Sequence, residues 1–380
     1  MKALTILAGP SRRSGVFARY ALGEVAGLVS DTIIDNDLIP ESEIDNYILM
    51  RSLRDELVLL SHSIPYSRVQ RPSWRTTDER FIRTMPKPTD ISFADATDLR
   101  SSEIAEIVKQ DTNLPIYLYW SGGIDSSAYV TSVMKNWSKD LLDRCVIKLT
   151  HSSINEHPIF YNDHIRDKFQ TKSVYDFESW DKGYYINGEP ADGLWLQLNV
   201  LAQAWKTTSE PTVMNDNFWD TRNEFLASKL TDYMYEYLLA FIKRDSELAD
   251  FPVITTADFF WWMNFSLQYE TMIYKHLWEP KDCLQGDLST IEAFQDHIIC
   301  WYDSIEYQQW SMQSQIRRTK FDPKQLNSYK MEAKEYIYEF DKNEYALQYK
   351  TKMPSVYVET SGIKEVWWFD DGTQLEIKPR

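Results

Sequence analysis

The sequence predicts an α/β fold, a parallel sheet flanked by helices, with a helical C-terminal part and a small N-terminal region. Three observations lead to this prediction. Runs rich in β-branched and aromatic residues, at 116–120 and 144–150, are typical of buried strands. The segments around them carry apolar residues at helical spacing, and strands that alternate with helices form parallel sheets through right-handed crossovers. A further strand, in the segment 183–195, runs into a polar, acidic turn.

The first expected element is a helix over 99–110, because its apolar residues share one helical face. Ser101 or Asp98 is available to cap it. The elements that follow are, in order, a strand over 116–120, a helix over 127–137, a strand over 144–150, a helix that includes 163–169, and the strand that begins the segment 183–195.

At 380 residues the chain exceeds the usual size of one domain, so we expect a large domain with an added module. The expected boundaries are 1–97 for the N-terminal region, 98–354 for the α/β domain and 355–380 for a C-terminal extension. In that extension, two strands about an Asp371-Gly372 turn predict a β-hairpin. The aromatic-rich segment 257–278 predicts a buried packing helix rather than a ligand-binding one.

Composition limits the partners. With 43% hydrophobic and 14% aromatic residues the chain can bury a substantial core. Its formal net charge of -16 would repel a long polyphosphate, so we expect small-molecule substrates and no nucleic acid. No apolar run approaches the roughly 20 residues that span a bilayer, and the N-terminal apolar run is too short for a secretory signal. We therefore expect no membrane partner and a cytoplasmic protein.

Cysteine and histidine spacing predicts neither disulfides nor a zinc site. The three cysteines are far apart and form no C-x-x-C pair, so buried thiols are expected. Three histidines follow the second strand without an H-E-x-x-H pattern, and we expect them to contact a ligand or to lie on a polar surface. These residues are Cys145, Cys283, Cys300, His151, His157 and His164.

The string SGGIDSS, at 121–127, lies between the first strand and its following helix. Gly122 and Gly123 allow the backbone to approach a ligand closely, and the amides at a helix start favour phosphate. The hydroxyls of Ser121, Ser126 and Ser127 can add further hydrogen bonds to phosphate oxygens. The alternative is an ordinary Gly-Gly turn with an Asp or Ser helix cap.

Asp125, inside this string, would be repelled by a phosphate, so we expect it to bond the loop amides or to hold a Mg²⁺ that bridges the phosphates. The acidic turn NGEPADGLW, at 187–195, follows another strand. Because loops at the carboxyl ends of neighbouring parallel strands share one crevice, both turns are expected to face one ligand. For Asp192 the alternative is an N-cap of a helix beginning at Gly193.

SGGIDSS after IYLYW resembles the pyrophosphate loop of the ATP pyrophosphatase (PP-loop, adenine nucleotide alpha hydrolase-like) superfamily, which includes asparagine, GMP, NAD and argininosuccinate synthetases. The helix before the motif strand and the acidic turn 187–195 resemble the asparagine synthetase-like branch. The resemblance covers roughly Leu99 to Pro354. It implies a fold of the adenine nucleotide alpha hydrolase type, with ATP and Mg²⁺ as cofactors.

The resemblance also implies roles for individual residues. Asp125 and Asp192 would hold Mg²⁺ on the ATP phosphates, and basic residues near the end of the domain would approach the released pyrophosphate. For those basic residues the alternative is a solvated pair before Pro354. The other implied contacts are Ser121, Gly122, Gly123, Ser126 and Ser127 around the phosphates, Leu149 and Thr150 at the adenine, Gly188 and Glu189 in the acidic loop, and Lys350 and Lys352 at the pyrophosphate.

The implied activity is that of an ATP-dependent carbon-nitrogen ligase. It would adenylate a substrate carboxylate or carbonyl, release pyrophosphate, and form an amide with ammonia or an amine, AMP being the second product. Glutamine-dependent members begin with a cysteine after Met1, whereas Lys2 stands here, so glutaminase activity is not expected and 1–97 would be a reduced glutaminase-like or wrapping module. The alternatives are a nucleobase- or tRNA-modifying enzyme of the superfamily and a non-catalytic nucleotide-binding protein.

Overall fold

The computed structural model describes residues 67–70, 83–174, 183–195, 217–220, 230–270, 273, 297–313 and 330–348, and the backbone of the strands 365–368 and 374–377. The chain divides into two compact units, which are described separately. Unit 1 comprises Met1–Lys87, Asp192–Pro280 and Ser311–Lys324, and unit 2 comprises Pro88–Ala191, Lys281–Trp310 and Gln325–Arg380. Lys2, Cys283, Lys350 and Lys352 lie outside the described residues.

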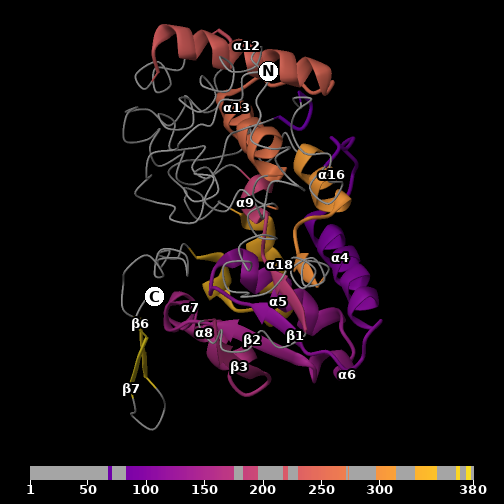
Figure 1. Cartoon of the computed structure of the whole chain (residues 1–380), viewed down its shortest axis with the longest axis vertical. Coiled ribbons are helices and arrows are strands. Elements are labelled where there is room, and N and C mark those ends of the chain that lie inside the picture. The colour runs from indigo at the N-terminus through magenta and orange to yellow at the C-terminus, as the bar shows by residue number, and fades with distance from the viewer. Residues whose placement is uncertain are drawn as a thin grey trace, which may run out of the picture. The chain divides into compact units, whose positions relative to one another are not determined.

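Unit 2 is built on a five-stranded parallel sheet in the order β3-β2-β1-β4-β5 (Figure 1). The strands are β1 (Ile116–Tyr119), β2 (Cys145–Leu149), β3 (Gln170–Ser173), β4 (Tyr184–Asn187) and β5 (Ile298–Cys300). The register aligns Leu118 of β1 with Ile147 of β2 and Ile186 of β4, and all three side chains are fully buried. The predicted parallel sheet is confirmed, with β1, β2 and β4 inside the segments expected from sequence.

The strand order changes direction on the two sides of β1. The chain moves from β1 to β2 to β3 on one side, and β4 and β5 lie on the other. In open parallel sheets such a change of direction leaves a crevice at the carboxyl ends of the flanking strands. The glycine loop follows β1 and the acidic loop follows β4, so both begin at this edge of the sheet.

Three helices of unit 2 pack together: α4 (Phe93–Val108), α5 (Ile124–Asn136) and α18 (Met331–Asp341). Figure 1 shows α5 and α18 beside the sheet with α4 next to them. Shorter helical segments complete the unit: α6 (Lys139–Leu142), α7 (His151–Glu156), α8 (Pro158–Phe160), the π-helical turn η3 (Tyr161–Ile165) and the 3-10 turn η8 (Glu344–Leu347). The sequence predicted a helix that includes 163–169, but the observed helical turn η3 ends at Ile165.

The helix expected over 99–110 begins six residues earlier, at Phe93. Its N-cap is Ser92, whose hydroxyl accepts a 3.0 Å hydrogen bond from the amide of Asp95, so the prediction of Ser101 or Asp98 as the cap is wrong. The reason is that the buried face continues toward the N-terminus, where Phe93 is 3% exposed. Since residues before Asp98 also belong to this buried face, the helix begins before Asp98.

Unit 1 contains α12 (Asp232–Leu248), α13 (Thr256–Trp262) and the π-helical turn η5 (Met263–Gln268). The described part of the aromatic-rich segment is helical and buried, as predicted; Trp262 is 0% exposed. Among the described residues no helix is both long enough and apolar enough to cross a membrane. The strands β6 (Glu365–Trp368) and β7 (Gln374–Ile377) pair antiparallel, which agrees with the expected hairpin.

Cys145 and Cys300 are free and buried, in agreement with the sequence prediction. Burial raises the pKa of the Cys145 thiol to about 12. Burial also raises the pKa of Cys300, where the nearby carboxylates of Asp303 and Glu189 add to the effect. Both thiols are thus neutral at physiological pH and serve as small apolar side chains.

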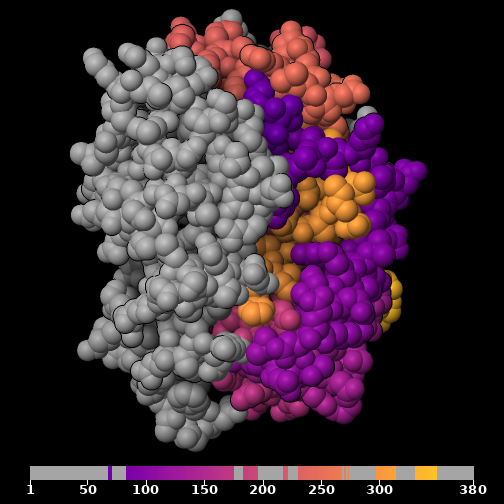
Figure 2. All heavy atoms as spheres, turned by 45° about the vertical axis from the view of Figure 1, so that its right-hand side comes forward, coloured from indigo at the N-terminus to yellow at the C-terminus, as the bar shows by residue number. Residues whose placement is uncertain are grey.

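Arg100 connects α4 to the end of β5. Its Nε donates to the carbonyl of Trp301 and its Nη2 to the carbonyl of Cys300, both at 2.9 Å. Figure 2 shows the orange surface of the segment that includes β5 bordering the purple surface that includes α4. The guanidinium supplies donors to two buried carbonyls that follow the sheet, which fixes the helix to the strand end.

We expect Arg100→Met to lower the free energy of unfolding by about 2–4 kcal/mol, because the Trp301 carbonyl loses its guanidinium donor and the Cys300 carbonyl keeps the Asp303 amide but loses its second donor. The matched control is Lys109→Met, which removes the exposed ion pair with Glu106 on the same helix and should cost at most about 0.5 kcal/mol. Urea unfolding followed by circular dichroism measures both. Equal midpoints for the two variants would contradict the anchoring role.

Candidate functional site

The glycine loop joins β1 to α5 and is shaped by contact with α7. Gly122 has φ +78°, a backbone conformation that favours glycine. A Cβ at this position would lie 2.1 Å from the carbonyl oxygen of Ser153 in α7. Gly122 is therefore required by its conformation and by its neighbour, independently of any ligand.

The serine hydroxyls of the loop are bonded within the protein. Ser126 Oγ accepts from the amide of Ser121 and donates to the carbonyl of Gly123, each at 3.1 Å. Ser127 Oγ accepts from Trp120 Nε1 at 3.1 Å and is fully buried. Ser126 and Ser127 thus shape the loop, whereas Ser121 is exposed. The expected phosphate contacts of this string would be made by Ser121 and by the backbone amides at the start of α5, which have no intrahelical acceptors.

Asp125 lies in the first turn of α5 and pairs with a lysine from a distant part of the chain. Its Oδ2 is 2.5 Å from Nζ of Lys330, a residue 205 positions away in sequence. The Lys330 side chain is 5% exposed and that of Asp125 is 25% exposed. The N-cap of α5 is Gly123, which makes no side-chain cap bond, so the alternative of an Asp or Ser cap is not what the structure contains.

Lys330 immediately precedes α18 and has a left-handed backbone, with φ 54°. Such a conformation is unfavourable for a non-glycine residue and is held by its surroundings. Lys334 follows one turn later, so it shares a helix face with Lys330, and it is 1% exposed. Burial lowers the pKa of Lys334 to about 8. Neither lysine was predicted from the sequence, because neither belongs to a recognisable motif.

The acidic loop lies against the start of α5. A Cβ at Gly188 would be 3.7 Å from the amide nitrogen of Ser126, an ordinary contact distance. Residues after β5 join the two loops, since Tyr302 donates from its amide to the Glu189 carbonyl (3.0 Å) and from its hydroxyl to the Asp125 carbonyl (2.9 Å). The expectation that the two loops lie together at one edge of the sheet is confirmed.

Asp192 belongs to unit 1 and is described with that unit. It lies in the first turn of α9 (Ala191–Leu194), and its carbonyl accepts a 3.3 Å hydrogen bond from Asn264. The helix begins at Ala191, so Asp192 is not the N-cap of a helix that begins at Gly193. Its metal-binding role stays a prediction.

Leu149 and Thr150, expected at the adenine, are both 1% exposed at the end of β2. Thr150 caps α7, because its hydroxyl accepts from the amide of Ser153 at 3.1 Å and the amide of Thr150 in turn donates to Ser153 Oγ. This capping box holds the helix on which Gly122 packs. An adenine contact by these two residues stays a prediction.

His157 does not lie on a polar surface, contrary to one of the expectations, whereas His151 and His164 are partly exposed. His157 is 2% exposed, its ring stacks on Phe160 and Tyr345, and its Nδ1 is 3.4 Å from Ser127 Oγ. His164 Nε2 lies 3.2 Å from Asp341 at the end of α18. Within the described ranges, no three His, Cys, Asp or Glu side chains form a group that could hold a metal by themselves.

The site therefore combines the helix-start amides with the Lys330–Asp125 pair, and the acidic loop that carries Glu189 lies against it. Amides at a helix start together with an ammonium group favour a multiply charged anion. A carboxylate beside that anion suits a hard divalent cation, since Mg²⁺ is held in proteins by one or two carboxylates plus substrate phosphates. The arrangement is suited to a metal-bound polyphosphate more than to a neutral ligand.

We expect Gly122→Ala to lower the free energy of unfolding by about 2–4 kcal/mol, because the added methyl meets a backbone carbonyl and the backbone is left-handed. Gly188→Ala is the matched control in the neighbouring loop. Its nearest contact would be 3.5 Å, so a change within about 1 kcal/mol is expected. Thermal and urea unfolding of both variants measure the difference. A Gly122→Ala protein as stable as the Gly188→Ala protein would contradict the loop geometry.

Comparison with known proteins adds no identification. No family model matches the chain, and neither a curated protein nor a solved structure matches it.

Proposed function

We propose that the chain is an ATP-dependent ligase of the asparagine synthetase-like branch of the ATP pyrophosphatase superfamily, with the sheet of unit 2 as its nucleotide-binding fold. The reaction would activate a substrate carboxylate or carbonyl with release of pyrophosphate and form an amide with ammonia or an amine. The observation that carries the proposal is the Lys330–Asp125 pair at the start of α5, beside a glycine loop at the carboxyl edge of a parallel sheet.

The residues present fit ATP and Mg²⁺. Asp125 supplies a partly exposed carboxylate at the loop, and Glu189 supplies a second on the loop that lies against it. Mg²⁺, when bound, neutralises phosphate charge and so makes pyrophosphate a better leaving group. The Lys330 ammonium would then pair with a phosphate oxygen, which compensates its positive charge. The amides of residues 124–126 would donate further hydrogen bonds to the phosphates.

In the proposed reaction an oxygen of the substrate carboxylate attacks the α-phosphorus of ATP, and the bond from that phosphorus to the pyrophosphate oxygen breaks. Lys330 and the helix-start amides stabilise the charge that grows on pyrophosphate as it leaves. Ammonia or an amine next attacks the acyl carbon, AMP departs, and the nitrogen loses a proton. Lys334, one turn further along α18 than Lys330 and with a pKa of about 8, would be able to accept a proton above about pH 8.

We expect Asp125→Asn and Lys330→Met each to lower the rate of Mg²⁺-dependent pyrophosphate release by roughly 100-fold or more, since each removes a charge that acts on the leaving group. The assay supplies MgATP, ammonium and a panel of carboxylates that begins with L-aspartate. Lys330→Arg keeps the charge and should retain more activity than Lys330→Met.

Lys342→Met is the matched control for these variants. Lys342 also has a left-handed backbone, at the opposite end of α18, but it is exposed and pairs with Glu339. Its loss should leave the rate unchanged. Near-native rates for Asp125→Asn and Lys330→Met would contradict the proposal, whereas equal losses in all variants would point to an effect on folding.

A tRNA-modifying enzyme of the same superfamily would need to bind RNA. Because the net charge is -16, we expect RNA binding at about physiological salt to be weaker than micromolar. Fluorescence anisotropy with labelled tRNA measures it. Submicromolar binding would favour that alternative over an amide-forming ligase with a small substrate.

A further inference from the structure

The position of Lys330 depends on how α18 lies along α5. The two helices run in the same direction, because Lys330 before α18 meets Asp125 at the start of α5, and Tyr336 within α18 lies near the residues that end α5. Lys330 makes no side-chain cap bond that would fix it to its own helix. A shift of α18 by one residue would move it 1.5 Å along the axis and turn it by about 100°. Lys330 would then leave Asp125.

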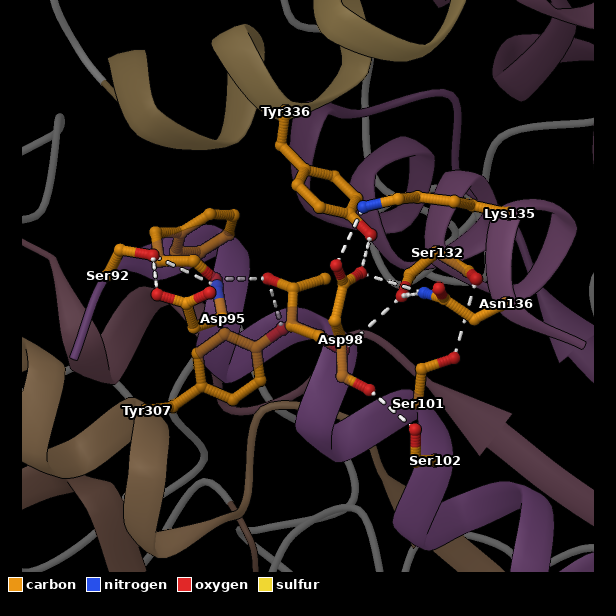
Figure 3. Close-up of polar contacts among 12 residues, drawn as sticks. Ser92, Asp95, Asp98, Ser101, Ser102, Ser132, Lys135, Asn136, Tyr307 and Tyr336 are labelled. Atoms are coloured by element: carbon orange, nitrogen blue, oxygen red, sulfur yellow. Dashed lines mark hydrogen bonds and ion pairs between the residues drawn. The ribbon is translucent and has the colours of Figure 1, made fainter.

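Asp98 of α4 receives contacts from both of these helices (Figure 3). Its Oδ2 is 2.7 Å from Lys135 Nζ, and its Oδ1 accepts from Asn136 Nδ2 at 2.8 Å, both from the end of α5. Tyr336 of α18 donates from its hydroxyl to the same Oδ1. The Lys135 ammonium also lies 5.0 Å from the centre of the Tyr336 ring. One carboxylate therefore joins three helices.

The protonation states favour this arrangement. Burial by itself raises the pKa of Asp98, but hydrogen bonds from Lys135, Tyr336 and Asn136 outweigh it, so that the pKa lies below its usual value. Burial raises the pKa of Tyr336 and the bond to Asp98 raises it further. Across the neutral range the carboxylate is thus an acceptor and the phenol a donor, and the contact is charge-assisted.

The contact adds a directional constraint to the packing of α18 on α5 and α4. Tyr336 of α18 reaches both α4 and the end of α5, through Asp98 and Lys135. The far end of α18 is held separately, by Asp341 near His164. Because two fixed points define how a helix lies on its neighbours, the pair of contacts at Tyr336 and Asp341 sets where Lys330 falls relative to Asp125.

We propose that Asp98 is a positioning residue of the pyrophosphate site: through Tyr336 and the end of α5 it holds α18 in the register that keeps Lys330 at Asp125. The inference rests on the proposed function, because the benefit of this register is the placement of a positive charge beside the phosphates. Asp98 itself touches no substrate and acts through Lys330.

The test measures binding of inorganic pyrophosphate with Mg²⁺ by calorimetry, so it does not require a known acceptor. Tyr336→Phe keeps the ring and removes the hydroxyl, and Asp98→Asn keeps the size and removes the charge. Each should weaken pyrophosphate binding by about tenfold, since a displacement of roughly 1 Å is enough to lose much of an oriented contact. Tyr336→Phe is the milder change and provides the result if Asp98→Asn folds poorly.

Ser92→Ala is the control on the same helix. It removes the N-cap of α4, which Figure 3 shows next to Asp95, and should lower the melting temperature without changing pyrophosphate affinity. A double-mutant cycle gives the decisive readout. In a Lys330→Met background, Tyr336→Phe should cause no further loss of affinity, because the charge that it positions is already gone.

The outcomes separate this inference from the proposed function. If Lys330→Met binds pyrophosphate weakly while Tyr336→Phe and Asp98→Asn bind it as the wild type does, the positioning role is overturned and the proposed function stands. The positioning role is also overturned if Tyr336→Phe loses as much affinity in the Lys330→Met background as in the wild type. A wild-type protein that binds no pyrophosphate with Mg²⁺ overturns both.

Discussion

The ion pair between Lys330 and Asp125 is the interaction on which the candidate site depends. Lys330 is almost completely buried, and a buried ammonium is tolerated only with a compensating charge and well-placed acceptors. The pair joins the helix after the glycine loop to a helix more than 200 residues later, with a separation of 205 positions. In the proposed function both charges keep partners when the ligands enter, because Asp125 meets the cation and Lys330 meets a phosphate oxygen. Both residues are therefore paired with an opposite charge in the free protein, and both would remain so when the ligands are bound.

The glycine loop shows how one motif serves structure and ligand together. Gly122 is needed for its contact with Ser153, and the hydroxyls of Ser126 and Ser127 bond within the protein. These internal bonds fix the shape of the loop. The first amides of α5 have no acceptors within the helix, so they are available to bind an anion. A loop built in this way is preorganised, which is what stabilisation of a leaving group requires.

The sequence predicted the elements whose signals are local. β1, β2 and β4 have apolar, β-branched or aromatic residues in one run, and α5 follows its loop at once, so all four could be located. β3 has the polar sequence QTKS at the edge of the sheet, so it has no pattern that stands out from a loop. It is a strand because the neighbouring strand supplies hydrogen-bond partners. β5 opens the apolar run IICWY, which has a strand pattern but was not among the predicted elements.

The same distinction applies to the site. The strand-loop-helix string was sufficient to predict where the two loops meet, because parallel strands end at a common edge. Lys330 could not be predicted, since its importance comes from a contact across 205 positions and from a left-handed backbone that no local motif requires. Lys350 and Lys352 were predicted instead on resemblance alone, and they lie outside the described residues.

The helix α4, which precedes the motif strand, has a role that its sequence did not indicate. Arg100 ties it to the end of β5, and Asp98 ties it to α5 and α18. Tyr307 donates to Thr97 of the same helix and accepts from Trp301, the neighbour of the Tyr302 that bonds to Asp125. Contacts to the residues after β5, to α5 and to α18 thus all come from about one turn of α4, between Thr97 and Arg100. The helix α4 therefore contacts α5, which follows the glycine loop, and α18, which follows Lys330. These contacts hold the loop and Lys330 in place relative to each other, although they are far apart in sequence.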